Sequence, residues 1–165
     1  VTLVDSPEAL AAALELALSF GDAVLVEERL QGRELTAAVF APTPQEPIAL
    51  PLIEIVTPAQ SWYDFEHRYA PGASEHRVPA PVSDAEEEAM KQIALAAHAC
   101  LGCRDLSRAD LILTTDGPVL LEVNTLPGMT PTSLYPDAAK AAGLTFPQLA
   151  RSLVQSALRR GPRFS

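Results

Sequence analysis

The feature that most constrains this 165-residue chain is a strand that ends in two oxygen-bearing side chains. In the run from Leu120 to Thr130, apolar residues lead to Glu122 and Asn124, and Pro127 and Gly128 then break the pattern. Side chains two residues apart share one face of a strand, so Glu122 and Asn124 are predicted to point the same way. The fold must therefore give this strand one polar face.

A second strand is predicted just upstream, from Leu106 to Thr114, with Arg108 and Asp110 at the same spacing. The segment 115–118, Thr-Asp-Gly-Pro, is a strong turn signal, so the two strands are predicted to form an antiparallel hairpin.

The length of the turn decides which side chains face each other. A two-residue Asp-Gly loop would turn Asp110 away from the face of Glu122, whereas an odd loop of residues 115–117 would place Asp110 opposite Glu122 and Arg108 opposite Asn124. In the second register two carboxylates and an amide oxygen converge, which suits Mg²⁺ that bridges phosphates. The alternative is a half-exposed hairpin with a polar, solvated face.

Composition excludes some classes of partner. Hydrophobic residues make up 48% of the chain and charged residues 20%, as in ordinary globular domains. A formal net charge of −9 argues against binding to nucleic acid or an anionic membrane. No run is long enough to span a membrane, and no signal peptide is expected in the first residues.

The two cysteines, Cys100 and Cys103, form a C-x-x-C pattern that is compatible with zinc or redox chemistry. A zinc site needs two further ligands, and His67, His76 and His98 are not spaced as a second pair. We therefore interpret the cysteines as small apolar residues at a helix end in a reduced, cytoplasmic protein.

The remaining elements follow from caps and periodicity. Strands are predicted at Val1–Val4, Ala23–Glu27, Leu35–Ala41 and Ile48–Val56, and an irregular segment from Thr57 to Pro81. Four helices are predicted: one after Ser6-Pro7 that ends at Gly21, one after the capping box at Ser83, one from about Ser133 to Ala142, and one after Thr145. The second helix has an apolar face of Met90, Ile93, Ala94, Ala97 and Leu101. The last is expected to turn Leu149, Leu153, Val154, Ala157 and Leu158 inward, before a basic tail of Arg159, Arg160 and Arg163.

The run from Glu122 to Ser133, Glu-Val-Asn-Thr-Leu-Pro-Gly-Met-Thr-Pro-Thr-Ser, together with Leu101-Gly102-Cys103-Arg104 and Arg108-Ala109-Asp110, resembles the C-terminal half of D-alanine-D-alanine ligases of the ATP-grasp superfamily. The similarity continues from the first residues to about Ala157. It implies an α+β fold: an ATP-grasp C-terminal domain with a largely antiparallel sheet flanked by helices. Residues 1–30 would be the end of the central ATP-binding subdomain, and residues 31–165 the catalytic domain with a lid loop at 57–81.

The resemblance also implies a set of nucleotide and metal contacts. The hinge segment that reads the adenine edge would contain Glu27, Glu28 and Leu30, and Glu34 would bind the ribose hydroxyls. Two Mg²⁺ ions, or Mn²⁺, would be held between the phosphates by Asp110, Glu122 and Asn124.

Other residues would contact the reacting groups. Arg108 and the backbone N–H of Gly128 would bind the developing oxyanion, and Ser133 would hold the carboxylate of the second D-alanine. In the lid, Tyr69 matches the family's tyrosine, while Arg68 stands where many relatives have lysine. That change keeps the charge but replaces a point charge with a planar fork.

The implied reaction is the ATP-dependent joining of two D-alanines through an acyl phosphate, for peptidoglycan synthesis. The full-length enzyme would be cytoplasmic and plausibly a homodimer. The chain's lysines, Lys91 and Lys140, both fall in predicted scaffold helices, and there is no clustered glycine loop for phosphate. The chain is therefore expected to need the N-terminal part of the ligase and to be inactive alone. The alternatives are a sister ligase that takes D-lactate or D-serine, and a catalytically silent nucleotide-binding module.

Overall fold

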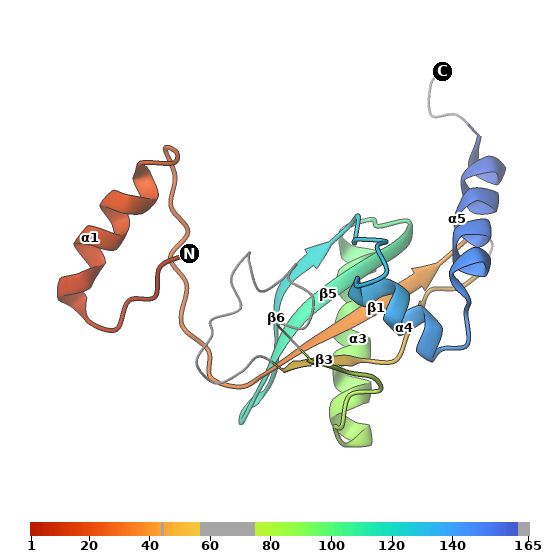
Figure 1. The fold of residues 1–165 in the computed structure, drawn as a ribbon, viewed down its shortest axis with the longest axis horizontal. Helices are drawn as coiled ribbons and strands as arrows, with labels where there is room; N and C mark the ends of the chain where they lie inside the picture. Colours follow the sequence, from red (N-terminus) through yellow and green to blue (C-terminus); the bar gives the residue numbers. More distant parts are fainter. Residues whose placement is uncertain (44, 57–74, 162–165) are drawn as a thin grey trace. The chain divides into compact units, whose positions relative to one another are not determined.

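The computed structural model describes residues 1–43, 45–56 and 75–161. These residues form two compact units, Val1–Leu30 and Gln31–Ser165, which are described separately (Figure 1). In the described part of the chain, no helix is both long enough and apolar enough to cross a membrane.

The first unit contains one helix, α1 (Pro7–Leu18), which begins as predicted. The Ser6 hydroxyl accepts a hydrogen bond from the N–H of Ala9, and Pro7 occupies the first helical position. No side chain of α1 is buried. The strands predicted at Val1–Val4 and Ala23–Glu27 are wrong, because neither segment has strand conformation. A strand requires a hydrogen-bonded neighbour, and these two segments do not pair with each other.

The second unit is built on a six-stranded antiparallel sheet in the order β4-β3-β1-β5-β6, with β2 paired to β1. The strands are β1 (Arg33–Ala41), β2 (Ile48–Ala49), β3 (Ile53–Val56), β4 (Glu75–Arg77), β5 (Asp105–Thr114) and β6 (Gly117–Asn124). The single strand predicted over 48–56 is wrong, since it is interrupted at 50–52. Pro51 lies in this interruption and has no N–H to give to a ladder.

The predicted hairpin is confirmed in its pairing but not in its turn. Asp110 lies opposite Glu122 and Arg108 opposite Asn124, as expected for the metal-binding register. The turn, however, pairs Thr114 with Gly117 and so has an even, two-residue loop. A register shift between Asp110 and Leu111 leaves Leu121 as an extra residue on β6. This β-bulge supplies the one-residue offset that we had assigned to the loop.

Helices cover both faces of the sheet (Figure 1). Helix α3 (Asp84–Cys100) packs Met90 and Ala94 against one face, which we call the α3 face. Helices α4 (Leu134–Ala141) and α5 (Phe146–Arg160) pack against the opposite face, mainly through Tyr135, Ala138 and Leu149. The α3-face core consists of Leu35, Ala37, Val39, Leu52, Ala80, Met90, Ala94, Ala109, Leu111 and Leu113.

The predicted helix starts at Ser83 and Thr145 are confirmed as capping boxes. The predicted inward faces are only partly correct. Leu149 of α5 is fully buried, but Val154 and Leu158 are 59% and 75% exposed, and Ala157 is also exposed. Leu101, at the end of α3, is exposed as well. The buried residues of α5 are Leu149 and Ser156, which share one face of the helix, and Val154 and Leu158 lie on its other side.

A polar network instead fixes the C-terminal part of α5. The buried Ser156 hydroxyl donates to Asp105 and accepts from the N–H of Thr43, and Arg160 also binds Asp105. Arg159 donates to the carbonyl of Thr43 at 2.7 Å. Two arginines of the predicted basic tail therefore hold α5 to the ends of β1 and β5.

Candidate active site

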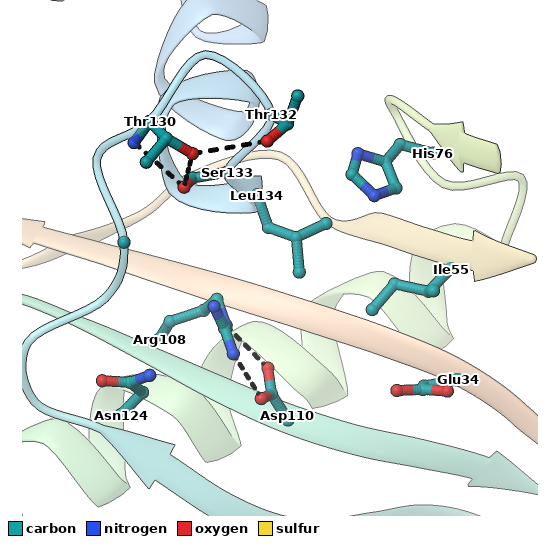
Figure 2. Close-up of a pocket in the computed structure, with 11 residues that line it drawn as sticks. Glu34, Ile55, His76, Arg108, Asp110, Asn124, Thr130, Thr132, Ser133 and Leu134 are labelled. Carbon is teal, nitrogen blue, oxygen red and sulfur yellow. Dashed lines mark hydrogen bonds and ion pairs between the residues drawn. The ribbon is translucent and has the colours of Figure 1, made fainter. Parts of the chain in front are cut away.

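The face opposite α3 carries a polar pocket, which we call the site face (Figure 2). The polar side chains of β1 and β5 reach this face because the even-numbered residues of both strands point to it, while the odd-numbered residues form the α3-face core. The register aligns Glu34 with Ile55 and Ile55 with His76, so three strands contribute one side chain each to the pocket. Its lining residues are Glu34, Ile55, His76, Arg108, Asp110, Asn124, Gly128, Thr130, Thr132, Ser133 and Leu134.

An ion pair lies on the floor of this pocket. Arg108 donates from Nε and Nη2 to the two carboxylate oxygens of Asp110, at 2.8 and 2.6 Å. The two side chains are only 11% and 13% exposed, so the pair is largely shielded from water. The buried Thr36 hydroxyl also donates to Asp110 Oδ1 at 2.7 Å. The carboxylate is therefore held by Arg108 of its own strand and by Thr36 of the neighbouring strand β1.

The proposed metal ligands come together on the hairpin. Asp110 and Glu122 are direct cross-strand partners, and Asn124 lies one pleat further along β6 on the same face. The side-chain oxygen of Asn124 accepts from the N–H of Leu126 at 3.1 Å, which fixes the amide. Within the described residues, no group of three or more His, Cys, Asp or Glu side chains could hold one ion. The set is two carboxylates and an amide, all hard oxygen donors, and this chemistry fits Mg²⁺.

The loop after β6 brings hydroxyl groups to the opposite wall of the pocket. Ser133 Oγ accepts from the N–H of Thr130 at 3.0 Å and lies 2.8 Å from Thr130 Oγ1. Gly128 approaches the same oxygen so closely that a Cβ there would lie 2.8 Å from it. A side chain at position 128 would therefore displace the Ser133 hydroxyl, and the backbone of Gly128 does not lie in the left-handed region.

His76 closes the side of the pocket beside Thr132 and Leu134 (Figure 2). Its Nδ1 lies 3.2 Å from Asp137 Oδ2 on α4, so this contact joins β4 to the helix that begins at Ser133. Neither residue was expected in the site, and neither was Thr36. The position of Thr36, two residues after Glu34 on the same strand face, is a signal that could have revealed it.

The structure does not place every predicted site residue in this pocket. Glu27, Glu28 and Leu30 belong to the first unit, whose placement relative to the pocket is not described. Arg68 and Tyr69, with most of the predicted lid, lie outside the described residues. Glu122 is exposed on β6 and does not line the pocket itself. The structure therefore brings together Glu34, Arg108, Asp110, Asn124, Gly128 and Ser133, with Glu122 beside Asp110.

Comparison with known proteins identifies relatives of both the sequence and the fold. Residues 1–155 match the family model described as "D-ala D-ala ligase C-terminus". A D-alanine--D-alanine ligase from Pelotomaculum thermopropionicum is 45% identical over 159 residues, which cover 96% of this chain and 49% of that protein. The chain thus spans about half the length of this curated relative.

Two solved structures carry the same fold. The D-alanine--D-alanine ligase of Bacillus anthracis in complex with ATP gives a TM-score of 0.78 at 28% identity, covering 94% of this chain and 48% of that one. The VanG D-Ala:D-Ser ligase of Enterococcus faecalis gives a TM-score of 0.75 at 32% identity, covering 92% of this chain and 43% of that one. The antiparallel sheet with flanking helices is therefore the fold of this family's C-terminal domain.

Proposed function

Because this chain belongs to the D-alanine-D-alanine ligase family, we propose that it is the C-terminal catalytic part of an ATP-dependent ligase that joins two D-alanines. The reaction passes through an acyl phosphate, supplies the dipeptide for peptidoglycan, and takes place in the cytoplasm, with the full-length enzyme a homodimer. One observation carries this proposal: a shielded Arg108–Asp110 pair faces a cluster of hydroxyl donors across one pocket.

Asp110, Glu122 and Asn124 would hold two Mg²⁺ ions against the nucleotide phosphates. When bound, the ions neutralise charge on the phosphates during transfer. Asp110 is already bonded to Arg108 and Thr36, yet a carboxylate has about four lone-pair sites and can also accept a metal. The contacts with Arg108 and Thr36 would then orient the ligand rather than compete with the ion.

Arg108 and the N–H of Gly128 would stabilise the oxyanion that develops when the second amine attacks the acyl phosphate. In that step the neutral amine nitrogen bonds to the acyl carbon and the carbon–oxygen bond to phosphate breaks. Phosphate leaves with that electron pair and takes up the proton that the amine loses. Arg108 is suited to this role because the Asp110 carboxylate holds its planar guanidinium in a fixed orientation.

Ser133 would bind the carboxylate of the second D-alanine. It occupies the N-cap position of α4, where backbone N–H groups and the positive end of the helix dipole favour an anion. Glu34, on the far side of Asp110, would accept from the ribose hydroxyls of the nucleotide.

The remaining contacts would come from the first unit and the lid. In this proposal residues 1–30 are the end of the central ATP-binding subdomain, and Glu27, Glu28 and Leu30 read the adenine edge. Leu16, Phe20 and Leu25 are 55%, 86% and 79% exposed, which supports packing of this unit against further protein. Arg68 and Tyr69 would close over the second substrate.

A hybrid ligase tests the proposal. The N-terminal half of the Pelotomaculum thermopropionicum relative is joined to this chain, and D-alanine-dependent phosphate release from ATP is measured. The hybrid should be active, and residues 1–165 alone should give no phosphate release above background. Without the N-terminal half, the site is open to water, so it neither positions the substrates nor keeps the low dielectric that strengthens its charged contacts. Turnover by the isolated chain at the rate of the hybrid would contradict the fragment proposal.

D-Serine as the second substrate is the other candidate, because a D-Ala:D-Ser ligase shares this fold at similar identity. The hybrid ligase is therefore assayed with D-alanine, D-serine and D-lactate in competition. We expect mainly D-alanyl-D-alanine. A product that contains mainly D-serine would show that the chain belongs to a D-alanine-D-serine ligase. Nucleotide binding without any product would favour a catalytically silent nucleotide-binding module.

A further inference from the structure

Helix α4 begins differently from the other helices of the described chain. In α1, α3 and α5 the N-cap hydroxyl accepts from the N–H three residues later, at Ala9, Glu86 and Gln148 respectively. Ser133 has the same extended N-cap backbone, with φ −83° and ψ 140°, but its side chain makes no capping bond. The third residue after it is Pro136, which has no N–H to offer.

The Ser133 hydroxyl is instead turned toward the loop that precedes the helix (Figure 2). It accepts from the Thr130 N–H and lies 2.8 Å from the Thr130 hydroxyl, which is itself 3.4 Å from the Thr132 hydroxyl. Three hydroxyl groups thus form a short chain along the pocket wall. No hydrogen bond to the N–H groups of Leu134 and Tyr135 is found among the described residues.

Which hydroxyl donates to which in this row of hydrogen bonds decides whether Ser133 can donate to a ligand. A hydroxyl has one proton and two acceptor sites, and a carboxylate only accepts. If Thr130 donates to Ser133, the Ser133 oxygen receives two hydrogen bonds, from the N–H and the hydroxyl of Thr130, and its own proton remains for the pocket. Thr132 can in turn donate to Thr130. Hydroxyl chains that share one direction polarise each other and strengthen the last bond.

We propose that Thr130 is a positioning residue for the second substrate: its hydroxyl donates to Ser133, so that Ser133 donates to the substrate carboxylate instead of capping α4. This inference rests on the proposed function, because it assigns the carboxylate to Ser133. It adds the residue that sets the direction of the Ser133 hydroxyl, and it leaves the α4 N–H groups uncapped for the same anion.

The test is a double-mutant cycle in the hybrid ligase. Thr130→Val removes the hydroxyl but keeps the shape and the backbone N–H, and should raise KM for the second D-alanine about fivefold, the effect of one hydrogen bond. KM for ATP should stay unchanged, and Thr130→Ser should restore the original value. In a Ser133→Ala background, Thr130→Val should have no further effect, because the hydroxyl it orients is gone.

Two controls separate positioning from general loss of structure. Thr114→Val removes a hydroxyl that bonds the β5–β6 turn outside the pocket, so it should lower stability without changing either KM. D-Alaninamide, which lacks the carboxylate, should serve the original and Thr130→Val enzymes equally as second substrate.

The outcomes distinguish the two proposals. If Ser133→Ala leaves KM for the second D-alanine unchanged, the proposed carboxylate site is wrong. If Ser133→Ala raises that KM but Thr130→Val does not, only the Thr130 inference is overturned. It is also overturned if Thr130→Val causes the same loss with and without the Ser133 hydroxyl.

Discussion

The two faces of the sheet have different roles, although alternate residues of the same strands form both: the α3 face is a buried core, and the site face carries the polar pocket. On the α3 face, Leu35, Met90 and Leu111 are completely buried, and burial of such side chains stabilises the fold by about 1.5 to 3 kcal/mol each. On the site face, the same strands place Asp110 and Arg108 at the floor of a pocket. A strand of period two can therefore hold a core and a reactive cluster only a few ångströms apart.

The α3 face also contains a buried charge, Glu54, which lies between two arginines. Glu54 is 6% exposed, and Arg33 donates to it at 2.7 Å while Arg77 lies 3.6 Å away. The hydrogen bond from Arg33 holds the pKa of the Glu54 carboxyl below its ordinary value, against the effect of burial. These groups sit at the rim of the core and join β1, β3 and β4, so their role is structural.

The largest effect should come from moving a side chain between the two faces. Deleting Val123 would transfer Asn124 to the α3 face, and phosphate release by the hybrid ligase should fall roughly a thousandfold, since the metal supplies several kcal/mol. Deleting Leu121 removes the bulge but leaves Glu122 opposite Asp110, so most activity should remain. Equal loss in both variants would show that β6 tolerates no deletion, and would break the comparison.

Next in size is truncation of the α3-face core. Met90→Ala should lower the free energy of unfolding of this chain by about 2 to 5 kcal/mol, because it leaves a cavity under the sheet. Leu158→Ala, at a side chain that is 75% exposed, should change it by at most about 0.5 kcal/mol. Denaturant unfolding measures both. The activity of folded hybrid molecules should not change in either variant, which would separate the two faces.

A smaller effect is expected at the pocket wall. Gly128→Ala would place a methyl group 2.8 Å from Ser133 Oγ and displace that hydroxyl. KM for the second D-alanine should rise about fivefold to tenfold, the equivalent of one lost hydrogen bond. Gly21→Ala, where an added Cβ would meet no atom within 4 Å, is the matched control and should leave KM unchanged.

The smallest effect concerns pH and again distinguishes the faces. Burial lowers the pKa of His98, whose Nδ1 bonds the buried Ser107 hydroxyl at 2.7 Å on the α3 face. The unfolded chain then binds the extra proton first, so stability should fall as the pH drops through about 6.5. His98→Gln should flatten this slope in urea unfolding at pH 5.5 to 7.5. Loss of the Glu54 contribution should come only at lower pH, well below this window.

Local signals in the sequence predicted much of this fold. The caps at Ser6, Ser83 and Thr145 are confirmed because a cap depends on residues within one turn of the helix. The facing of Asp110 and Glu122 is confirmed although the predicted three-residue turn is not, because the bulge at Leu121 restores the same pairing. Where the outcome depended on distant packing, as for Val154 and Leu158 on α5, the expectation was wrong.

The site was predictable to the extent that its residues lie in one continuous motif. Arg108, Asp110, Gly128 and Ser133 come from neighbouring segments of the chain and meet in the pocket. His76 lines it from β4, whose pairing with β3 no local pattern encodes. Thr36 bonds Asp110 from β1, and only its spacing from Glu34 on the same strand face signals it locally. The contact between His76 and Asp137 joins residues 61 positions apart, and short-range spacing carries no information about it.

The extra residue at Leu121 also bears on how relatives should be aligned. The hairpin depends on parity: a two-residue turn with a bulge and a three-residue turn without one leave Glu122 facing Asp110. Insertions and deletions can therefore move between the turn and the strand while the carboxylate pair is retained. A relative that is one residue longer in the turn and one shorter in the strand would look misaligned in sequence, yet would present the same pair of side chains.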